Sequence, residues 1–202
     1  MEISLELLVF LNALTALFVI IDPIGTALIF NALTKGQGAH QRFLQAFKAS
    51  VISALLLVLF GNYGASLLSY LGISINALKI SGGLLLFYTA FQMINSELKF
   101  KMEGVVEDIS VYPMSIPLLA GPGSLTVSIL LFSNVKSSAD ELAVFSAVIL
   151  ICTLTCLLMT CSIYLKNLVG KTGDEILRRF LGVILAALAI QFILDGFSSI
   201  LN

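Results

Sequence analysis

The sequence predicts an all-α integral membrane protein with six transmembrane helices, arranged as two inverted three-helix repeats. Three observations lead to this fold: an apolar composition, six long apolar runs and a weak internal repeat. Of 202 residues, 58% are hydrophobic and 11% charged, with a mean hydropathy of +1.04, whereas soluble domains carry about 25% charged residues. Because apolar runs fill nearly the whole chain, we expect one transmembrane domain over residues 1–202.

Six apolar runs define the expected helices. A helix needs about 20 apolar residues to cross the hydrocarbon layer of a membrane, and every run reaches that length. The runs cover residues 5–33, 44–71, 73–94, 111–134, 142–165 and 180–201. The second and third runs almost touch in sequence, so we expect a tight antiparallel pair that turns at Leu71-Gly72.

The positions of lysine and arginine predict the orientation, because positive residues in short loops stay in the cytoplasm. With the N-terminus outside, only Lys79 and Lys136 fall in outer segments. The nine other basic residues then lie on the cytoplasmic side: Lys35, Arg42, Lys48, Lys99, Lys101, Lys166, Lys171, Arg178 and Arg179. We therefore expect a bacterial-type inner (plasma) membrane protein with both termini outside. Its first residues lack the basic n-region of a signal peptide.

An offset of 99 residues aligns the two halves of the chain, giving repeats of about 1–98 and 99–202. The matched pairs are Pro23 and Pro122, Lys79 and Arg178, Gly83 and Gly182, Ala90 and Ala189, Gln92 and Gln191, and Ile94 and Ile193. Each half holds three spans, so the halves would cross the membrane in opposite senses. Many secondary transporters share this inverted-repeat plan.

The first helix is expected to break in mid-membrane at Asp22-Pro23-Ile24-Gly25-Thr26. Proline removes a backbone donor and glycine relaxes the chain, while Asp and Thr offer oxygens to the freed groups. Two interpretations of Asp22 stay open: it only caps the half-helix that begins at Pro23, or it also binds a solute or a cation. Asp22, Pro23, Gly25 and Thr26 are candidate binding residues.

The fourth helix is expected to break at the matching place, where residues 117–124 read PLLAGPGS. A half-helix that restarts after Pro122 offers N–H groups and the positive end of its dipole to an anion, and freed carbonyls can hold a cation. Gly121, Pro122, Gly123 and Ser124 are the candidate binding residues. The alternative is that both breaks are proline kinks that only shape packing.

Four further polar residues lie within the apolar runs. Gln92 and Gln191 occupy equivalent positions in the third and sixth runs, where an amide can bond to substrate, to opened backbone or to another helix. Lys79 is interpreted as an anchor at the membrane interface, with a role as a ligand as the alternative. Asp195 is interpreted as structural, with a functional role as the alternative.

Other function classes find less support. An enzyme would need a base beside its nucleophile, yet the single histidine, His40, lies in the first polar loop. The three cysteines lie in a run without His or carboxylate, so no metal site is expected. The net charge of −1, without a basic cluster, argues against nucleic acid. No cofactor is expected beyond a coupling H⁺ or Na⁺.

Stretches 22–26, 117–124 and 178–196 together resemble the MarC family of integral membrane proteins. The resemblance covers essentially the full chain. It implies six spans and a grouping with small amino-acid transporters and exporters of the lysine-exporter type. A carrier for small neutral amino acids is the function that this grouping implies.

We therefore expect a secondary transporter that moves a small solute, such as a neutral amino acid, by alternating access. Asp22 would bind an ammonium group or the coupling cation, and Gly121, Gly123 and Ser124 would present donors to a carboxylate. The alternatives are a non-transporting membrane scaffold or sensor, and a channel. The expected partners are the solute and the lipid bilayer, and homo-oligomer formation stays open.

Overall fold

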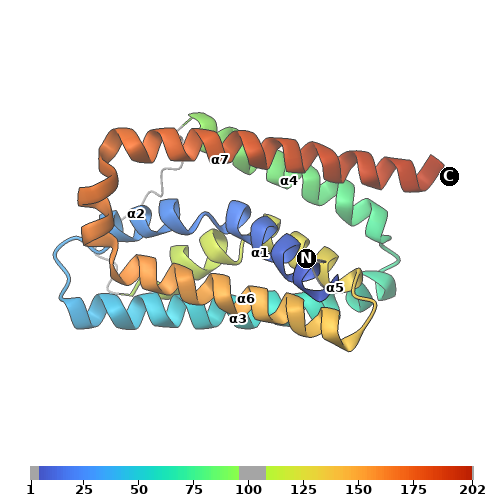
Figure 1. Cartoon of the computed structure of the whole chain (residues 1–202), viewed down its shortest axis with the longest axis horizontal. Helices are drawn as coiled ribbons and strands as arrows, with labels where there is room; N and C mark the ends of the chain where they lie inside the picture. Colours follow the sequence, from blue (N-terminus) through green and yellow to red (C-terminus); the bar gives the residue numbers. More distant parts are fainter. Residues whose placement is uncertain (1–4, 96–107, 202) are drawn as a thin grey trace.

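The computed structural model describes residues 5–95 and 108–201, and these residues form helices and no strand. In chain order the elements are α1 (Leu5–Ile21), α2 (Pro23–Leu33), α3 (Ala39–Tyr70), α4 (Ile75–Asn95), η1 (Ser110–Leu119), α5 (Pro122–Ser133), α6 (Ser138–Thr160) and α7 (Ser162–Leu201). Figure 1 shows most of them running along the long axis of the molecule. The predicted all-helical class is confirmed.

Within residues 5–95 and 108–201, five helical stretches are long and apolar enough to cross a membrane when α1 and α2 are taken together, and the bent pair of η1 and α5 makes a sixth. The five are Leu5–Leu33, Ala39–Tyr70, Ile75–Asn95, Ser138–Thr160 and Arg179–Ser198. Large exposed apolar side chains on these stretches, such as Leu59, Leu84 and Leu194, suit contact with lipid rather than water.

Local signals explain several helix ends. The side chain of Ser137 accepts a hydrogen bond from the N–H of Asp140. Asp140 and Glu141 place negative charge in the first turn of α6, and both features favour a helix start there. At the end of α3, Gly72 has φ +72°, a conformation that glycine adopts readily. The chain turns there into α4, as predicted from Leu71-Gly72.

The last helix is longer than predicted. The sequence placed it at residues 180–201, assigned residues up to 165 to the fifth helix and left residues 166–179 as a polar joint, but α6 ends at Thr160 and α7 begins at Ser162. The joint contains no proline, and its leucines and lysines favour helix. Its first turns cross one end of the molecule before α7 follows the long axis (Figure 1).

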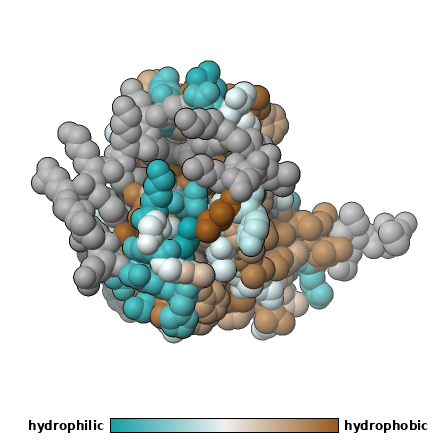
Figure 2. Space-filling view, turned by 90° about the vertical axis from the view of Figure 1, so that its left-hand side faces the viewer, coloured by the Kyte–Doolittle hydropathy of each residue, from teal (hydrophilic) through white to brown (hydrophobic). Residues whose placement is uncertain are grey.

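The loops alternate between the two ends of the molecule. The α2–α3 loop and the α6–α7 junction lie at one end, and the α3–α4 and α5–α6 loops lie at the other (Figure 1). Figure 2 faces the first end, where hydrophilic side chains gather beside a hydrophobic flank. Exposed Lys35 lies at this end. Among the nine basic residues predicted there, Lys99, Lys101 and the side chains of Lys166, Lys171 and Arg178 lie outside the described part.

Helices of the first half pack mainly on helices of the second. α1 and α2 contact α6, η1 and α5 contact α3, and α4 lies along α7. Two glycines allow the last contact: a Cβ at Gly83 would lie 2.7 Å from the backbone oxygen of Ala189, and one at Gly182 would lie 3.2 Å from that of Ala90. Small residues let helix backbones approach closely in membranes.

Candidate functional site

The first break is a single residue wide. α1 ends at Ile21, α2 begins at Pro23, and Asp22 between them has φ 46° and ψ 70°. The Asp22 carboxylate accepts a 3.0 Å hydrogen bond from the N–H of Gly25, and the hydroxyl of Thr26 donates to the carbonyl of Ile21 at 2.8 Å. The side chains of the predicted motif therefore satisfy the backbone groups that the break releases.

Gly25 provides the space for this arrangement. A Cβ at position 25 would collide with the Asp22 carboxylate, so any larger residue would displace the carboxylate from the helix end. Asp22 is buried, with 8% of its surface exposed. The structure shows the helix cap that both interpretations of Asp22 included. Binding of a solute or a cation by Asp22 stays a prediction.

The second break has the same plan but a different cap. α5 begins at Pro122 after Gly121, which offers no side chain to the first turn. The hydroxyl of Ser124 donates to the carbonyls of Leu119 at 2.7 Å and Gly121 at 3.1 Å. This hydroxyl therefore satisfies carbonyls on both sides of Ala120, while the N-cap residue Gly121 provides no side-chain cap for the N–H groups that begin α5.

The chain before the second break is irregular over most of η1. Tyr112 and Ile116 adopt extended backbone conformations, and η1 meets α5 at an angle of 56°. The hydroxyl of Ser115 donates to the carbonyls of Ser110 at 2.8 Å and Ala49 at 3.0 Å. Such bonds allow irregular backbone at membrane depth, because protein groups replace the absent water.

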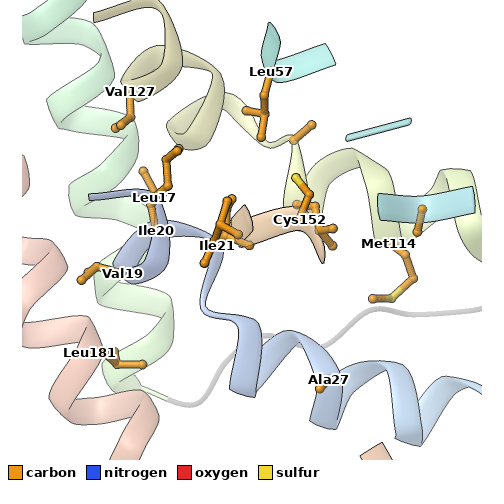
Figure 3. Close-up of a cluster of buried hydrophobic side chains, with 14 of the residues drawn as sticks. Leu17, Val19, Ile20, Ile21, Ala27, Leu57, Met114, Val127, Cys152 and Leu181 are labelled. Atoms are coloured by element: carbon orange, nitrogen blue, oxygen red, sulfur yellow. The ribbon is translucent and has the colours of Figure 1, made fainter. Parts of the chain in front are cut away.

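The two breaks lie next to each other. A Cβ at Gly123 would lie 3.2 Å from the side chain of Ile20, two residues before Asp22. Figure 3 shows the chain passing from Ile20 and Ile21 to α2 within a cluster of buried hydrophobic side chains, which includes Cys152 of α6. The breaks therefore meet in an apolar interior, where electrostatic interactions are strong.

The predicted glutamines lie elsewhere. The side-chain amide of Gln191 is exposed and donates to Asp195 at 2.7 Å. Gln92 is half-buried on α4 and makes no side-chain hydrogen bond within the described residues. The structure thus brings together the candidates of the two breaks and leaves both glutamines outside that group.

Arg42 is a buried residue that sequence reasoning treated only as a loop charge. It is 7% exposed, and its guanidinium donates to Asn31 of α2 at 3.0 Å and to Ser162 of α7 at 2.8 Å. The same group lies 5.7 Å from the ring centre of Phe30, a cation–π distance. No local pattern reveals these contacts, because Ser162 is far away in sequence.

The helical architecture, apolar exterior and multiple spans define a multi-pass integral membrane protein. A family model described as "MarC family integral membrane protein" matches residues 7–201. The chain belongs to the MarC family.

Curated relatives support this assignment over nearly the full length of the chain. A UPF0056 membrane protein of Archaeoglobus fulgidus is 34% identical, and the match covers 97% of this chain and 95% of that protein. UPF0056 membrane protein BU267 of Buchnera aphidicola is 32% identical, and the match covers 99% of this chain and 97% of that protein. UPF0056 membrane protein YvbG of Bacillus subtilis is 31% identical, covering 90% of each chain. No solved structure matches the chain.

Proposed function

We propose that this protein is a secondary transporter of a small solute such as a neutral amino acid, working by alternating access in the inner membrane. The observation that carries the proposal is the pair of half-helices that begin at Pro23 and Pro122, with Ile20 at the end of α1 lying against Gly123 in the first turn of α5. Broken helices at equivalent places in two inverted halves mark the substrate site of many transporters.

The packing of the helices supports the inverted repeat. α1 and α2 pack on α6, while their sequence counterparts η1 and α5 pack on α3, the counterpart of α6. The α4–α7 contact pairs each helix with its own counterpart. This exchange of partners is what a two-fold axis in the membrane plane would produce, and rocking of the two halves about that axis is the proposed movement.

The different caps suggest how the two breaks divide the binding. The first turn of α2 already holds the Asp22 carboxylate, so a further anion there would be repelled. The first turn of α5 has no side-chain cap and suits the carboxylate of a solute. We assign that carboxylate to the N–H groups of Gly123 and Ser124, and the ammonium group, or a coupling H⁺ or Na⁺, to Asp22.

Uptake of labelled small amino acids into proteoliposomes tests the proposal, with and without a proton or sodium gradient. We expect saturable, gradient-driven uptake that Asp22→Asn abolishes and Gly38→Ala leaves intact, since a Cβ at Gly38 meets nothing within 4 Å. Uptake that does not saturate would indicate a channel. No uptake and no stabilisation of the purified protein by any amino acid would favour a non-transporting scaffold or sensor.

The proposed orientation places both termini and Lys79 on the outer side. A reporter that is active only outside the cytoplasm should therefore function when fused to the C-terminus. Activity of a cytoplasm-specific reporter at the same position would reverse the orientation while leaving the binding site unchanged.

A further inference from the structure

A cavity of about 250 Å³ lies among α1, α4, α5 and α7, apart from the contacts that join the two breaks. Lys79 and Asp195 both line it, as do the amide side chains of Asn12 and Asn134. The remaining wall is apolar and includes Phe192. A small cavity with one cationic group, one anionic group and an apolar wall has the chemistry of a site for a small zwitterion.

Close helix packing brings together the stretches of α4 and α7 that carry the two charged residues. A Cβ at Gly196 would lie 2.9 Å from the backbone oxygen of Asn76 and 3.3 Å from the Cβ of Lys79. Glycine at 196 therefore lets α7 approach α4 at the level of Lys79. Asp195, the preceding residue, receives a 2.7 Å hydrogen bond from the amide of Gln191, which orients its carboxylate.

The Lys79 side chain is half-buried, and within the described residues it forms no hydrogen bond or ion pair, although Asp195 lines the same cavity. An ammonium group partly removed from water gains most from a carboxylate within contact distance.

The cavity lies between the first break and the end of the molecule that carries the α3–α4 and α5–α6 loops. Lys79 follows the α3–α4 loop and Asn134 precedes the α5–α6 loop, and these loops share one end. Ala16 also lines the cavity, six residues before Asp22, which is roughly 9 Å along a helix. A solute held here would be separated from the first break by less than two helical turns.

We propose that this cavity is a second binding site, specific for a zwitterionic amino acid with an apolar side chain. Lys79 binds the carboxylate, Asp195 binds the ammonium group, and the side chain packs on the wall that includes Phe192. Its place as an outer binding site on the transport route rests on the proposed function. The class of solute follows from the two charged side chains alone.

Equilibrium binding of radiolabelled L-leucine to the purified full chain tests this site. Lys79→Gln and Asp195→Asn should each weaken binding about tenfold or more, because each removes one charged partner. Lys136→Gln and Glu6→Gln remove exposed charges outside the cavity and should leave binding unchanged. Lys79→Arg and Asp195→Glu should retain most of it, which separates loss of charge from misfolding.

Competition with single-charge analogues sharpens the test. 4-Methylpentanoate lacks the ammonium group and 3-methylbutylamine lacks the carboxylate, so neither should displace L-leucine at concentrations where unlabelled L-leucine does. Equal competition by either analogue, or L-leucine binding that ignores both Lys79→Gln and Asp195→Asn, would overturn the proposal. The absence of binding to the wild-type chain for L-leucine, L-alanine and L-valine alike would overturn it too.

The two proposals fail differently. Binding that depends on Lys79 and Asp195, without uptake in proteoliposomes, would remove the carrier and keep the cavity site. If Asp22→Asn abolishes gradient-driven uptake while L-leucine binding is insensitive to Lys79→Gln, the carrier proposal stands and the cavity site is overturned. In the favoured case, Asp22→Asn stops uptake and leaves L-leucine binding at the cavity unchanged.

Discussion

Gly83 of α4 and Gly182 of α7 make equivalent contacts, because each lies against an isoleucine of the other helix. A Cβ at Gly83 would lie 2.6 Å from the side chain of Ile193, and a Cβ at Gly182 would lie 2.9 Å from the side chain of Ile94. Both the glycines and the isoleucines are 99 residues apart. Two residue pairs matched by sequence alone thus form the same contact twice along one helix interface.

The reciprocal contact predicts that Gly83→Val and Gly182→Val have similar effects. Each added side chain would force α4 and α7 apart, and overpacking of this kind costs about 1–3 kcal/mol. We expect both variants to lower the midpoint of thermal unfolding in detergent. Gly38→Ala should unfold like the wild type, since its Cβ would meet nothing within 4 Å. A wild-type midpoint for Gly83→Val would contradict the interface.

Substitutions at Asp22 can separate its two roles. Asn accepts the hydrogen bond from Gly25 and tolerates positive φ, so Asp22→Asn should leave stability close to that of the wild type while removing the charge. Asp22→Ala also removes the cap and should cost about 1 kcal/mol. Thermal unfolding and uptake, measured on the same preparations, check this order. Equal stability of the two variants would show that the cap contributes little.

Gly25→Ala should act through Asp22. Its Cβ would collide with the carboxylate, so we expect uptake to fall as it does in Asp22→Asn, with a further loss of stability from the displaced cap. The double variant Gly25→Ala with Asp22→Asn should then lose little more uptake than either single variant, because neighbouring sites are not additive. If the losses of uptake in the two single variants added up fully in the double variant, Gly25 and Asp22 would act independently.

Arg42 is expected to be a stability residue. Arg42→Met leaves Asn31 and Ser162 without their charged donor, a loss of about 2–3 kcal/mol. Arg42→Lys should recover only part of this, because an ammonium group lacks the planar fork of guanidinium. Unfolding midpoints in detergent measure both effects, with the exposed Lys35→Gln as the control. Stability unchanged in Arg42→Met would mean that other contacts hold α2 against α7.

The ion pair of Lys48 with Asp108 predicts a small effect of pH. Hydrogen bonds from the side chain and the backbone N–H of Ser110 hold the pKa of Asp108 below its ordinary value of 3.8, and Lys48 at 3.1 Å acts in the same direction. A lowered folded-state pKa stabilises the protein above the unfolded-state pKa, and the effect disappears as pH falls through the folded-state value.

Because both side chains are about half exposed, Asp108→Asn should cost less than about 1 kcal/mol near pH 7. Unfolding midpoints of the variant and the wild type should converge as the pH falls below 3.8. A difference that persisted or grew at low pH would assign the effect to something other than the charge.

Proline and glycine explain why the breaks could be found from sequence. Pro23 and Pro122 lack a backbone donor and suit the first turn of a helix, so each fixed a helix start to the residue that the structure shows. Composition likewise determined the helical class and the number of apolar stretches. The start of α7 was missed because residues 162–165 continue the apolar run of the fifth helix, while residues 166–179 are polar enough for a loop and contain no proline that would forbid a helix.

Contacts between distant residues were beyond sequence reasoning. Nothing around Arg42 indicates that it meets Ser162, and nothing around Asn12 indicates that it shares a cavity with Lys79 and Asp195. These groupings depend on how whole helices lie against each other. Lys79 and Asp195 were noticed individually, but their interpretation as an anchor and a structural residue came from each one's position along its own helix.

The exchange of partners between the halves has a consequence for biogenesis. α1 lies against α6 and α3 lies against α5, so the earliest helices to leave the ribosome have no lasting neighbours until the later ones are made. Helices α1 to α4 must wait in the bilayer, each with all backbone hydrogen bonds satisfied internally except at the Asp22 break. At that break the Asp22 carboxylate and the Thr26 hydroxyl bond to Gly25 and Ile21 within the same half, so the two halves, synthesised together as separate chains, should still find each other and assemble.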